Sequence, residues 1–284
     1  MRLYFILVRR VPPVPSPVLL EVFEILEQRG FRIESGIPEE LVARPDRLRV
    51  EHDLYILKSH TELALSLAGV LDTLGAHLLN PYVSCITTQD KIVASRRLRA
   101  AGVPIPRCWV TGDLAQMAQI AEETPLIVKP HRGHRGAGIS IVRNPSELAA
   151  LDPPESPVLI QELVEGSGED VKVYVAGDDV FAVRKEFSPT SFTLPGRSCT
   201  VSSEVREIAL ACGRILGLGL YGLDVLETDD GPVVVDVNYF PGYKGISGVA
   251  DVIADYIEDY ALGWRRLELP PLEAPAPLPA PAGT

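Results

Sequence analysis

The chain has 284 residues and a formal net charge of −11, with hydrophobic and charged fractions of 46% and 23%. This length supports one large domain or two to three small ones, and the acidic balance argues against general nucleic-acid binding, which needs a basic surface. The apolar start, Met1–Val8, is too short for a signal peptide or a membrane span, so we expect a cytoplasmic protein without nucleic-acid or membrane partners.

The first part of the chain alternates short apolar strands with helical patterns. Such alternation predicts a small parallel α/β unit, which we place at residues 1–85. Its strands are expected at Leu3–Val8, Phe31–Ser35, Asp53–Lys58 and His77–Asn80, and its helices at Val18–Arg29 and Thr61–Leu74.

A second unit, residues 86–165, opens with a predicted helix that glycine and proline stop. Its helices are expected at Thr88–Ala101 and Leu114–Glu123, and its strands at Leu126–Lys129, Ile139–Val142 and Val158–Leu163. A third unit, residues 166–266, has predicted strands at Val171–Ala176, Val180–Lys185, Tyr221–Glu227 and Val233–Val237, and helices at Ser203–Leu216 and Val249–Tyr260. Residues 267–284 are rich in proline and alanine, which predicts a disordered tail.

The four cysteines are far apart and form no CxxC pair. Free thiols in a reducing compartment therefore explain them better than a zinc site or a disulfide framework. They are Cys85, Cys108, Cys199 and Cys212.

A glycine-rich loop lies between two predicted strands of the second unit. Gly133, Gly136 and Gly138 can bring backbone N–H groups close to an anion, and Arg132, His134 and Arg135 surround them with basic side chains. The loop fits neither a Walker A motif nor a dinucleotide fingerprint, because no Gly-Lys-Ser/Thr follows and a strand rather than a helix comes next. A flexible surface turn is the alternative to a polyphosphate-binding lid.

Two lysines are placed to support such a lid. Lys129 ends an apolar strand and presents its ammonium group at the strand's edge, and Lys91 begins a helix about forty residues earlier. Each could contact nucleotide phosphates as a point charge, although each alone could equally be a solvated lysine.

A strand running into a turn follows, with the residues Gln161, Glu162, Leu163 and Val164. Such a segment can offer one carbonyl and one N–H to the edge of an adenine. Glu169 and Asp170 come just beyond it and could hold ribose hydroxyls.

Two carboxylates interrupt apolar strands of the third unit, where an unpaired charge is unfavourable. Asp224 lies in one strand, and Asp236 and Asn238 lie two residues apart in the next, so the latter two point to the same face. Two carboxylates and an amide oxygen are hard ligands that suit Mg²⁺. Hydrogen-bonded structural aspartates are the alternative.

Along the chain the motifs come in the order Lys91, Lys129 with the glycine loop, Gln161–Val164, Asp224, and then Asp236 with Asn238. This ordered set resembles the ATP-grasp superfamily over roughly residues 85–262. The resemblance implies an α/β fold, with α+β lobes, in which two lobes clamp ATP next to an N-terminal parallel α/β domain. It implies that Lys91 and Lys129 hold the α- and β-phosphates and that the loop 133–138 closes over the γ-phosphate. The backbone of Glu162 and Val164 would bind adenine, Asp170 or Glu169 the ribose, and Asp224, Asp236 and Asn238 would bind Mg²⁺ or Mn²⁺. The superfamily often has glutamate where this chain has Asp236.

Two branches of the superfamily compete. The stretch Gly168–Lys172 and the residues Asn238, Pro241 and Gly242 resemble the ribosomal protein S6 modification-type carboxylate–amine ligases, which form an acyl phosphate that an amine attacks. The stretches Lys172–Asp178 and Asp236–Tyr243 resemble the inositol trisphosphate 5/6-kinases, which phosphorylate a hydroxyl directly.

The ligase is the preferred hypothesis, because its branch is the broader of the two. For it, Arg184 would stabilise the acyl phosphate, and the candidate catalytic residues are Arg184, Lys129 and Arg135. A kinase would use Lys58, His134, Arg135 and Arg197 to bind a phosphorylated ring. A non-catalytic nucleotide-binding module is the third hypothesis, which the intact lysines and metal-binding residues disfavour. The expected ligands are therefore ATP, Mg²⁺ and a small-molecule or peptide acceptor, and no pattern specifies an oligomeric state.

Overall fold

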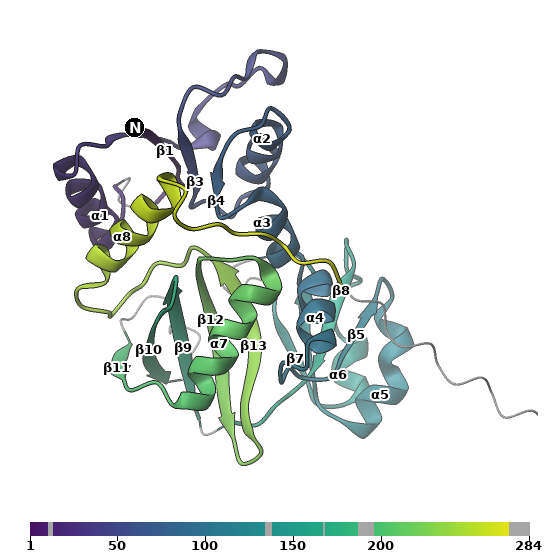
Figure 1. The fold of residues 1–284 in the computed structure, drawn as a ribbon. Helices are drawn as coiled ribbons and strands as arrows, with labels where there is room; N and C mark the ends of the chain where they lie inside the picture. The colour runs from purple at the N-terminus through teal and green to yellow at the C-terminus, as the bar shows by residue number, and fades with distance from the viewer. Residues whose placement is uncertain (11–13, 134–137, 167, 187–195, 273–284) are drawn as a thin grey trace, which may run out of the picture.

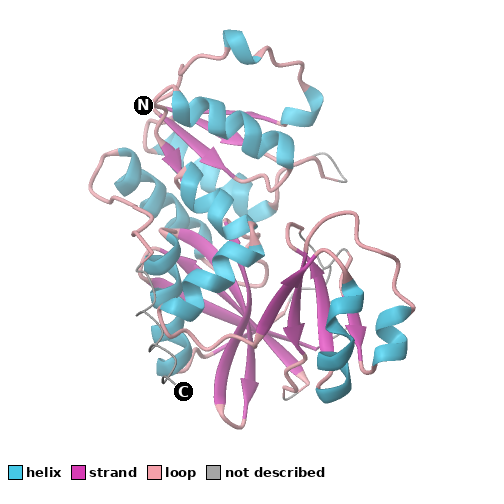
Figure 2. Cartoon of the chain, turned by 90° about the vertical axis from the view of Figure 1, so that its right-hand side faces the viewer, coloured by secondary structure: helices cyan, strands magenta, loops and turns pink. Residues whose placement is uncertain are grey.

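A computed structural model describes residues 1–10, 14–133, 138–166, 168–186 and 196–272. The chain forms three sheets in sequence order, of four, four and five strands. In Figure 1 the N-terminal sheet lies at the top, the C-terminal sheet at the lower left and the central sheet at the lower right. Figure 2 shows the two lower sheets side by side beneath the N-terminal one.

The N-terminal sheet is parallel, as predicted, with the strand order β2-β1-β3-β4. Its strands read as apolar runs because residues such as Leu3, Phe5 and Ile56 are fully buried between flanking helices. The elements are β1 (Arg2–Ile6), α1 (Pro17–Gln28), β2 (Arg32–Gly36), two 3₁₀ turns (Pro38–Glu40 and Pro45–Arg47), β3 (Leu54–Leu57), α2 (Glu62–Thr73) and β4 (Leu78–Leu79).

The single helix predicted at Thr88–Ala101 is wrong, because two helices meet there. α3 (Tyr82–Gln89) ends and α4 (Lys91–Ala100) begins around Asp90, whose backbone is extended. The Asp90 carboxylate accepts hydrogen bonds from the backbone N–H groups of Ile92 and Val93, 3.1 and 3.3 Å away. This capping starts a new helix at Lys91.

The central sheet is antiparallel, with the order β5-β8-β6-β7. One of its faces packs on short helices and forms a small separate core that includes Leu126, Val128 and Ile160. The elements are β5 (Cys108–Thr111), a 3₁₀ turn (Leu114–Met117), α5 (Ala118–Glu123), β6 (Leu126–Pro130), β7 (Ser140–Val142), α6 (Pro145–Ala149) and β8 (Val158–Glu162). The strand β5 and the helix α6 were not predicted.

The C-terminal sheet is antiparallel, with the order β11-β10-β9-β12-β13. The helix α7 covers one face, on which the buried Tyr221 donates a hydrogen bond to Ala209 O at 2.8 Å. The elements are β9 (Glu169–Ala176), β10 (Asp179–Glu186), β11 (Arg197–Cys199), α7 (Ser203–Leu216), β12 (Leu220–Thr228), β13 (Gly231–Tyr239) and α8 (Val249–Ala261).

The N-terminal and C-terminal sheets are joined through one hydrophobic core. The buried Asn80 accepts from the N–H groups of Gly219 and Leu220 and donates to Leu220 O, so it fixes the end of β4 to the start of β12. The helix α8 returns to lie beside α1, where Arg29 forms ion pairs with Asp255 and Glu258, both at 2.7 Å (Figure 1).

The segment after α8 runs back across the molecule toward α4 (Figure 1). Leu267 packs against the shared core, and the buried Arg97 of α4 donates hydrogen bonds to Ile215 O and Pro270 O. The predicted tail is therefore held against the fold at Leu267 and Pro270, and residues 273–284 lie outside the described residues.

Candidate active site

The two predicted metal-binding carboxylates lie opposite each other on the C-terminal sheet. Asp224 of β12 pairs in register with Asp236 of β13, and a bulge follows this pair. Directly paired residues of antiparallel strands share one face, so both carboxylates lie on the face away from α7. Asn238 shares that face, and its side-chain amide donates to Asp236 Oδ2 at 3.3 Å. The structure thus brings the predicted trio together.

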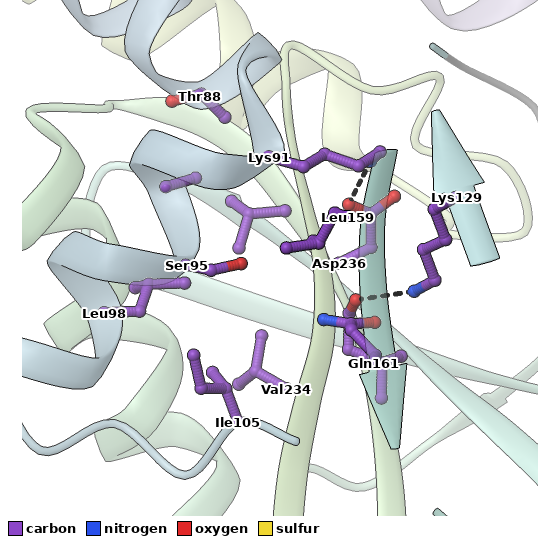
Figure 3. Close-up of a pocket in the computed structure, with 13 residues that line it drawn as sticks. Thr88, Lys91, Ser95, Leu98, Ile105, Lys129, Leu159, Gln161, Val234 and Asp236 are labelled. Carbon is purple, nitrogen blue, oxygen red and sulfur yellow. Dashed lines mark hydrogen bonds and ion pairs between the residues drawn. The ribbon is translucent and has the colours of Figure 1, made fainter. Parts of the chain in front are cut away.

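Each carboxylate has a lysine partner. Lys91, at the first turn of α4, lies 2.5 Å from Asp236 Oδ1 (Figure 3). Burial opposes ionisation of Asp236, but Lys91 and then Lys129 outweigh it, so the pKa of Asp236 is lowered. Lys172 of β9 lies 2.7 Å from Asp224 Oδ1. Burial opposes charge on Lys172, and Asp224 outweighs it, so the pKa of Lys172 is raised. Both ion pairs favour the charged forms.

Lys129 reaches the same place from the central sheet. It is only 7% exposed, and its ammonium group donates to Val235 O of β13 at 3.2 Å. Burial lowers the pKa of Lys129, and Asp236 partly opposes this effect. The ammonium group of Lys129 is suited to bind an anionic ligand, because the ligand can replace Val235 O as its hydrogen-bond partner.

A cavity lies between α4, β6, β8 and β13, with Lys91, Lys129 and Asp236 in its wall (Figure 3). Gln161 of β8 also lines it and is only 4% exposed. Its side-chain oxygen has no hydrogen-bond partner within the described part of the chain. A buried, unpaired acceptor of this kind favours a donor from a ligand or a water molecule.

Successive residues of the β9–β10 hairpin lie on opposite faces of the C-terminal sheet, so Lys185 and Arg184 have different surroundings. Asp170 and Lys185 pair in register on the face of Asp224. Burial, and then Asp224, raise the pKa of Asp170. Lys185 is 7% exposed, and burial, then Lys172 and Lys244, lower its pKa. Lys172 and Lys185 were not predicted as site residues.

Arg184 lies on the other face, beneath α7. It forms an ion pair with Glu227 at 2.6 Å and approaches Glu169 at 3.7 Å. The structure therefore does not bring Arg184 or Glu169 together with the carboxylate pair, and of the two predicted ribose-binding residues only Asp170 faces it. Arg197, a residue of the kinase hypothesis, lies 3.9 Å from Glu169 on the same remote face.

The segment predicted to bind adenine runs from the end of β8, an inner strand of the central sheet. The Glu162 N–H donates to Arg107 O at 3.0 Å, and the Leu163 N–H donates to Pro125 O at 2.8 Å. The Glu162 carboxylate pairs with Arg107 through two bonds of 2.8 and 3.0 Å. These bonds fix the path of the chain up to Val164.

The glycine loop is tied to α4 at its start. The Lys91 N–H donates to His131 O at 2.9 Å, and Arg132 lies 3.5 Å from Asp90. Gly138 has a φ of 73°, and a β-carbon there would lie 2.8 Å from the Pro130 ring, so this position requires glycine. The other predicted loop residues, His134, Arg135 and Gly136, lie outside the described residues.

The donor set fits a magnesium ion chemically, because two ionised carboxylates and an amide on one sheet face supply hard oxygen ligands. Groups of three or more histidine, cysteine or acidic residues able to hold a metal do not occur within the described ranges. Any metal would therefore rely on Asn238 or on a bound substrate for further ligands.

Comparison with known proteins agrees with this geometry. Residues 88–258 match the family model of the RimK-like ATP-grasp domain. A probable alpha-L-glutamate ligase 2 of Shewanella baltica is 27% identical over 219 residues, which cover 69% of this chain and 72% of that protein.

Solved structures show the same fold. A RimK domain protein of the ATP-grasp type from Sphaerobacter thermophilus matches with a TM-score of 0.74 and 23% identity, over 93% of this chain and 100% of that one. The ATP-grasp ligase PsnB, in complex with a precursor variant, Mg and ADP, matches with a TM-score of 0.62 and 19% identity, over 90% of this chain and 97% of that one. Within the part of the chain that the structure describes, none of the helices has the length and apolar character needed to cross a membrane.

Proposed function

The chain belongs to the RimK-like ATP-grasp family, whose members include carboxylate–amine ligases. From this premise we propose which of its residues bind ATP, the metal and the substrates of such a reaction. The observation that carries the proposal is the register pair Asp224–Asp236 with Lys91, Lys129 and Lys172 around it. Such an arrangement of opposite charges suits Mg-ATP, because the lysines can neutralise phosphates while the carboxylates hold the metal.

Lys91 and Lys129 are proposed to hold the α- and β-phosphates of ATP. Asp224, Asp236 and Asn238 would hold Mg²⁺, which when bound neutralises charge on the transferring phosphoryl group. The backbone of Glu162 and Val164, with Gln161 and Leu163 beside it, would bind adenine, and Asp170 the ribose. The glycine loop from Gly133 to Gly138 would cover the γ-phosphate. Residues 1–85, 86–165 and 166–266 would form the N-terminal domain and the two lobes, a division that the three separate sheets support.

The substrate carboxylate would take the γ-phosphoryl group, and an amine would then attack the resulting acyl phosphate. Lys185 is proposed to stabilise the acyl phosphate in place of Arg184, because it shares the face of Asp224 and Lys172. A fixed cation in a buried site stabilises developing negative charge more than one exposed to water.

Glutamate is proposed as a substrate. The relative from Shewanella baltica carries the name of a glutamate ligase. On this chain Lys172 pairs with Asp224, and Lys185 lies near Lys172 and Lys244, so these lysines could bind a carboxylate that does not react. Both the activated carboxylate and the amine could come from glutamate or from the end of a peptide.

Hydroxylamine trapping tests this proposal. The enzyme is incubated with Mg-ATP, N-acetyl-L-glutamate and hydroxylamine, and we expect hydroxamate to form together with ADP. In a parallel incubation with Mg-ATP and an inositol phosphate, phosphoryl transfer to the hydroxyl acceptor, together with no hydroxamate in the first incubation, would instead support the kinase hypothesis.

A further inference from the structure

A second pocket lies on the other side of Lys91 from the cavity that contains Lys129. Lys91 borders both, and Asn238 brings the proposed metal site to the edge of the second. Gly133, where the glycine loop begins, is also part of the wall. His60, Gln89 and Tyr239 line the same pocket as Lys91 and Asn238. The pocket therefore adjoins the end of the site at which the proposed γ-phosphate would lie.

His60 is held in this pocket by contacts from three elements. Its ring stacks on that of Tyr239, with the centroids 4.0 Å apart and the planes at 20°. The Tyr239 hydroxyl lies 2.8 Å from Ser59 O and 3.0 Å from Gln89 Oε1, and its single proton is shared between these two acceptors. Gln89 Nε2 in turn donates to His60 O at 3.0 Å. The end of β3, the last residue of α3 and the last residue of β13 thus fix the position of the imidazole.

The other charged and titratable groups near His60 have hydrogen-bond or ion-pair partners of their own. Lys91 is paired with Asp236, and burial raises the pKa of Tyr239, so its hydroxyl stays protonated. Lys58, two residues before His60, donates to Phe240 O at 2.6 Å. Glu39 accepts a hydrogen bond from Thr61, the residue after His60, at 2.5 Å. Among the residues in the pocket wall, only histidine has an ordinary pKa near neutral pH.

We propose that this pocket admits the amine substrate and that His60 accepts the proton that the amine loses during attack. The inference rests on the proposed ligase function. The neutral nitrogen forms a bond to the carbonyl carbon of the acyl phosphate, and the bond from that carbon to the phosphate oxygen breaks. Phosphate leaves with the electron pair. The proton of the attacking nitrogen goes to the imidazole, which then gives it to the departing phosphate.

The choice of nucleophile separates this role from a purely structural one. Hydroxylamine is neutral and reactive at pH 7 and needs little help from a base, whereas the amino group of L-glutamate is more basic and less available. The variant His60→Gln is compared with the wild type on Mg-ATP and N-acetyl-L-glutamate, with either nucleophile. We expect amide formation with L-glutamate to fall about a hundredfold, the lower range for loss of a general base. Hydroxamate formation should stay within about twofold.

A matched control is available in His77, which stacks on Tyr260 at 4.6 Å and lies away from both pockets. His77→Gln should leave both reactions unchanged.

Equal losses of amide and hydroxamate in His60→Gln would overturn the assignment, because they would indicate a structural role. Unchanged amide formation with L-glutamate would overturn it as well. A wild type that forms ADP but no hydroxamate would overturn the proposed function itself, on which the role of His60 rests.

Discussion

The N-terminal and C-terminal sheets differ from the central sheet in how they are held. The N-terminal and C-terminal sheets, together the two outer sheets, share one core. Hydrogen bonds from Asn80, Tyr239 and Tyr260 join the two regions. The central sheet has a small core of its own. At the cavity, the hydrogen bond of Lys129 with Val235 O joins it to the C-terminal sheet. We infer that the N-terminal and C-terminal sheets form one body and the central sheet another, with the site between the two.

The largest expected effect comes from Asp236, where the two bodies meet. Asp236→Asn removes the partner of Lys91 and one proposed metal ligand. We expect turnover to fall by roughly two to three orders of magnitude, as for other lost electrostatic contacts in active sites, and the melting temperature to be retained. Asp230→Asn, on the exposed turn between β12 and β13, is the matched control. Activity close to that of the wild type in Asp236→Asn would exclude its role in metal binding.

The separate cores can be compared by truncating one leucine in each. Leu126→Ala in the central core and Leu223→Ala in the shared core both remove fully buried side chains. We expect each to destabilise its region by about 2–5 kcal/mol. Hydrogen exchange should accelerate only in the central sheet for Leu126→Ala, and in both outer sheets for Leu223→Ala. Acceleration across all three sheets in Leu126→Ala would contradict the division into two bodies.

A smaller effect on activity is expected from the two basic residues on opposite faces of the β9–β10 hairpin. Lys185→Met removes a buried cation from the face of Asp224, whereas Arg184→Met breaks an ion pair with Glu227 beneath α7. Steady-state kinetics should show a loss of about tenfold to a hundredfold in kcat/KM for Lys185→Met, equivalent to about 1.4–2.7 kcal/mol, and a clearly smaller loss for Arg184→Met. The reverse order would restore Arg184 as the catalytic cation.

The smallest effect is expected at the contact between α1 and α8. Arg29→Ala removes two ion pairs whose partners are partly exposed. Such pairs contribute about 0–1 kcal/mol each, so urea unfolding should show a stability loss within about 2 kcal/mol. Because the shared core remains, the unfolding of the two outer sheets should stay cooperative. Two separate transitions for these sheets would mean that the ion pairs, rather than the core, join them.

Much of the fold could be predicted from local patterns. The helix at Ser203–Leu216 was predicted to the residue, because Ser202 caps its start and Gly217, with a φ of 64°, ends it. The break at Asp90 was missed, since a capping aspartate inside a continuous helical pattern looks like an ordinary polar residue. The short strand β5 was missed as well, because among the described strands it pairs only with β8, which lies about fifty residues later.

Site residues that lie on the same strand could be predicted from the sequence. Residues whose place in the site depends on how two strands pair were harder to predict. Asp236 and Asn238 follow from strand alternation alone. Choosing between Arg184 and Lys185 requires the register of the β9–β10 hairpin. The turn at Gly177 and Asp178 sets Lys185 opposite Asp170, a signal that was present in the sequence and not used. His60 belongs to the pocket only through tertiary contacts with Tyr239 and Gln89, which no local pattern reveals.

The central claim is that the chain activates a carboxylate as an acyl phosphate. It is tested most directly by tracing a carboxylate oxygen isotope into the released phosphate. N-acetyl-L-glutamate with a heavy oxygen isotope in its carboxylates is turned over with Mg-ATP and L-glutamate, and the released phosphate is analysed by mass spectrometry. Ligase chemistry transfers one carboxylate oxygen to the phosphate, so each phosphate released by coupled turnover should carry one heavy oxygen. Amide product accompanied by unlabelled phosphate would contradict the account.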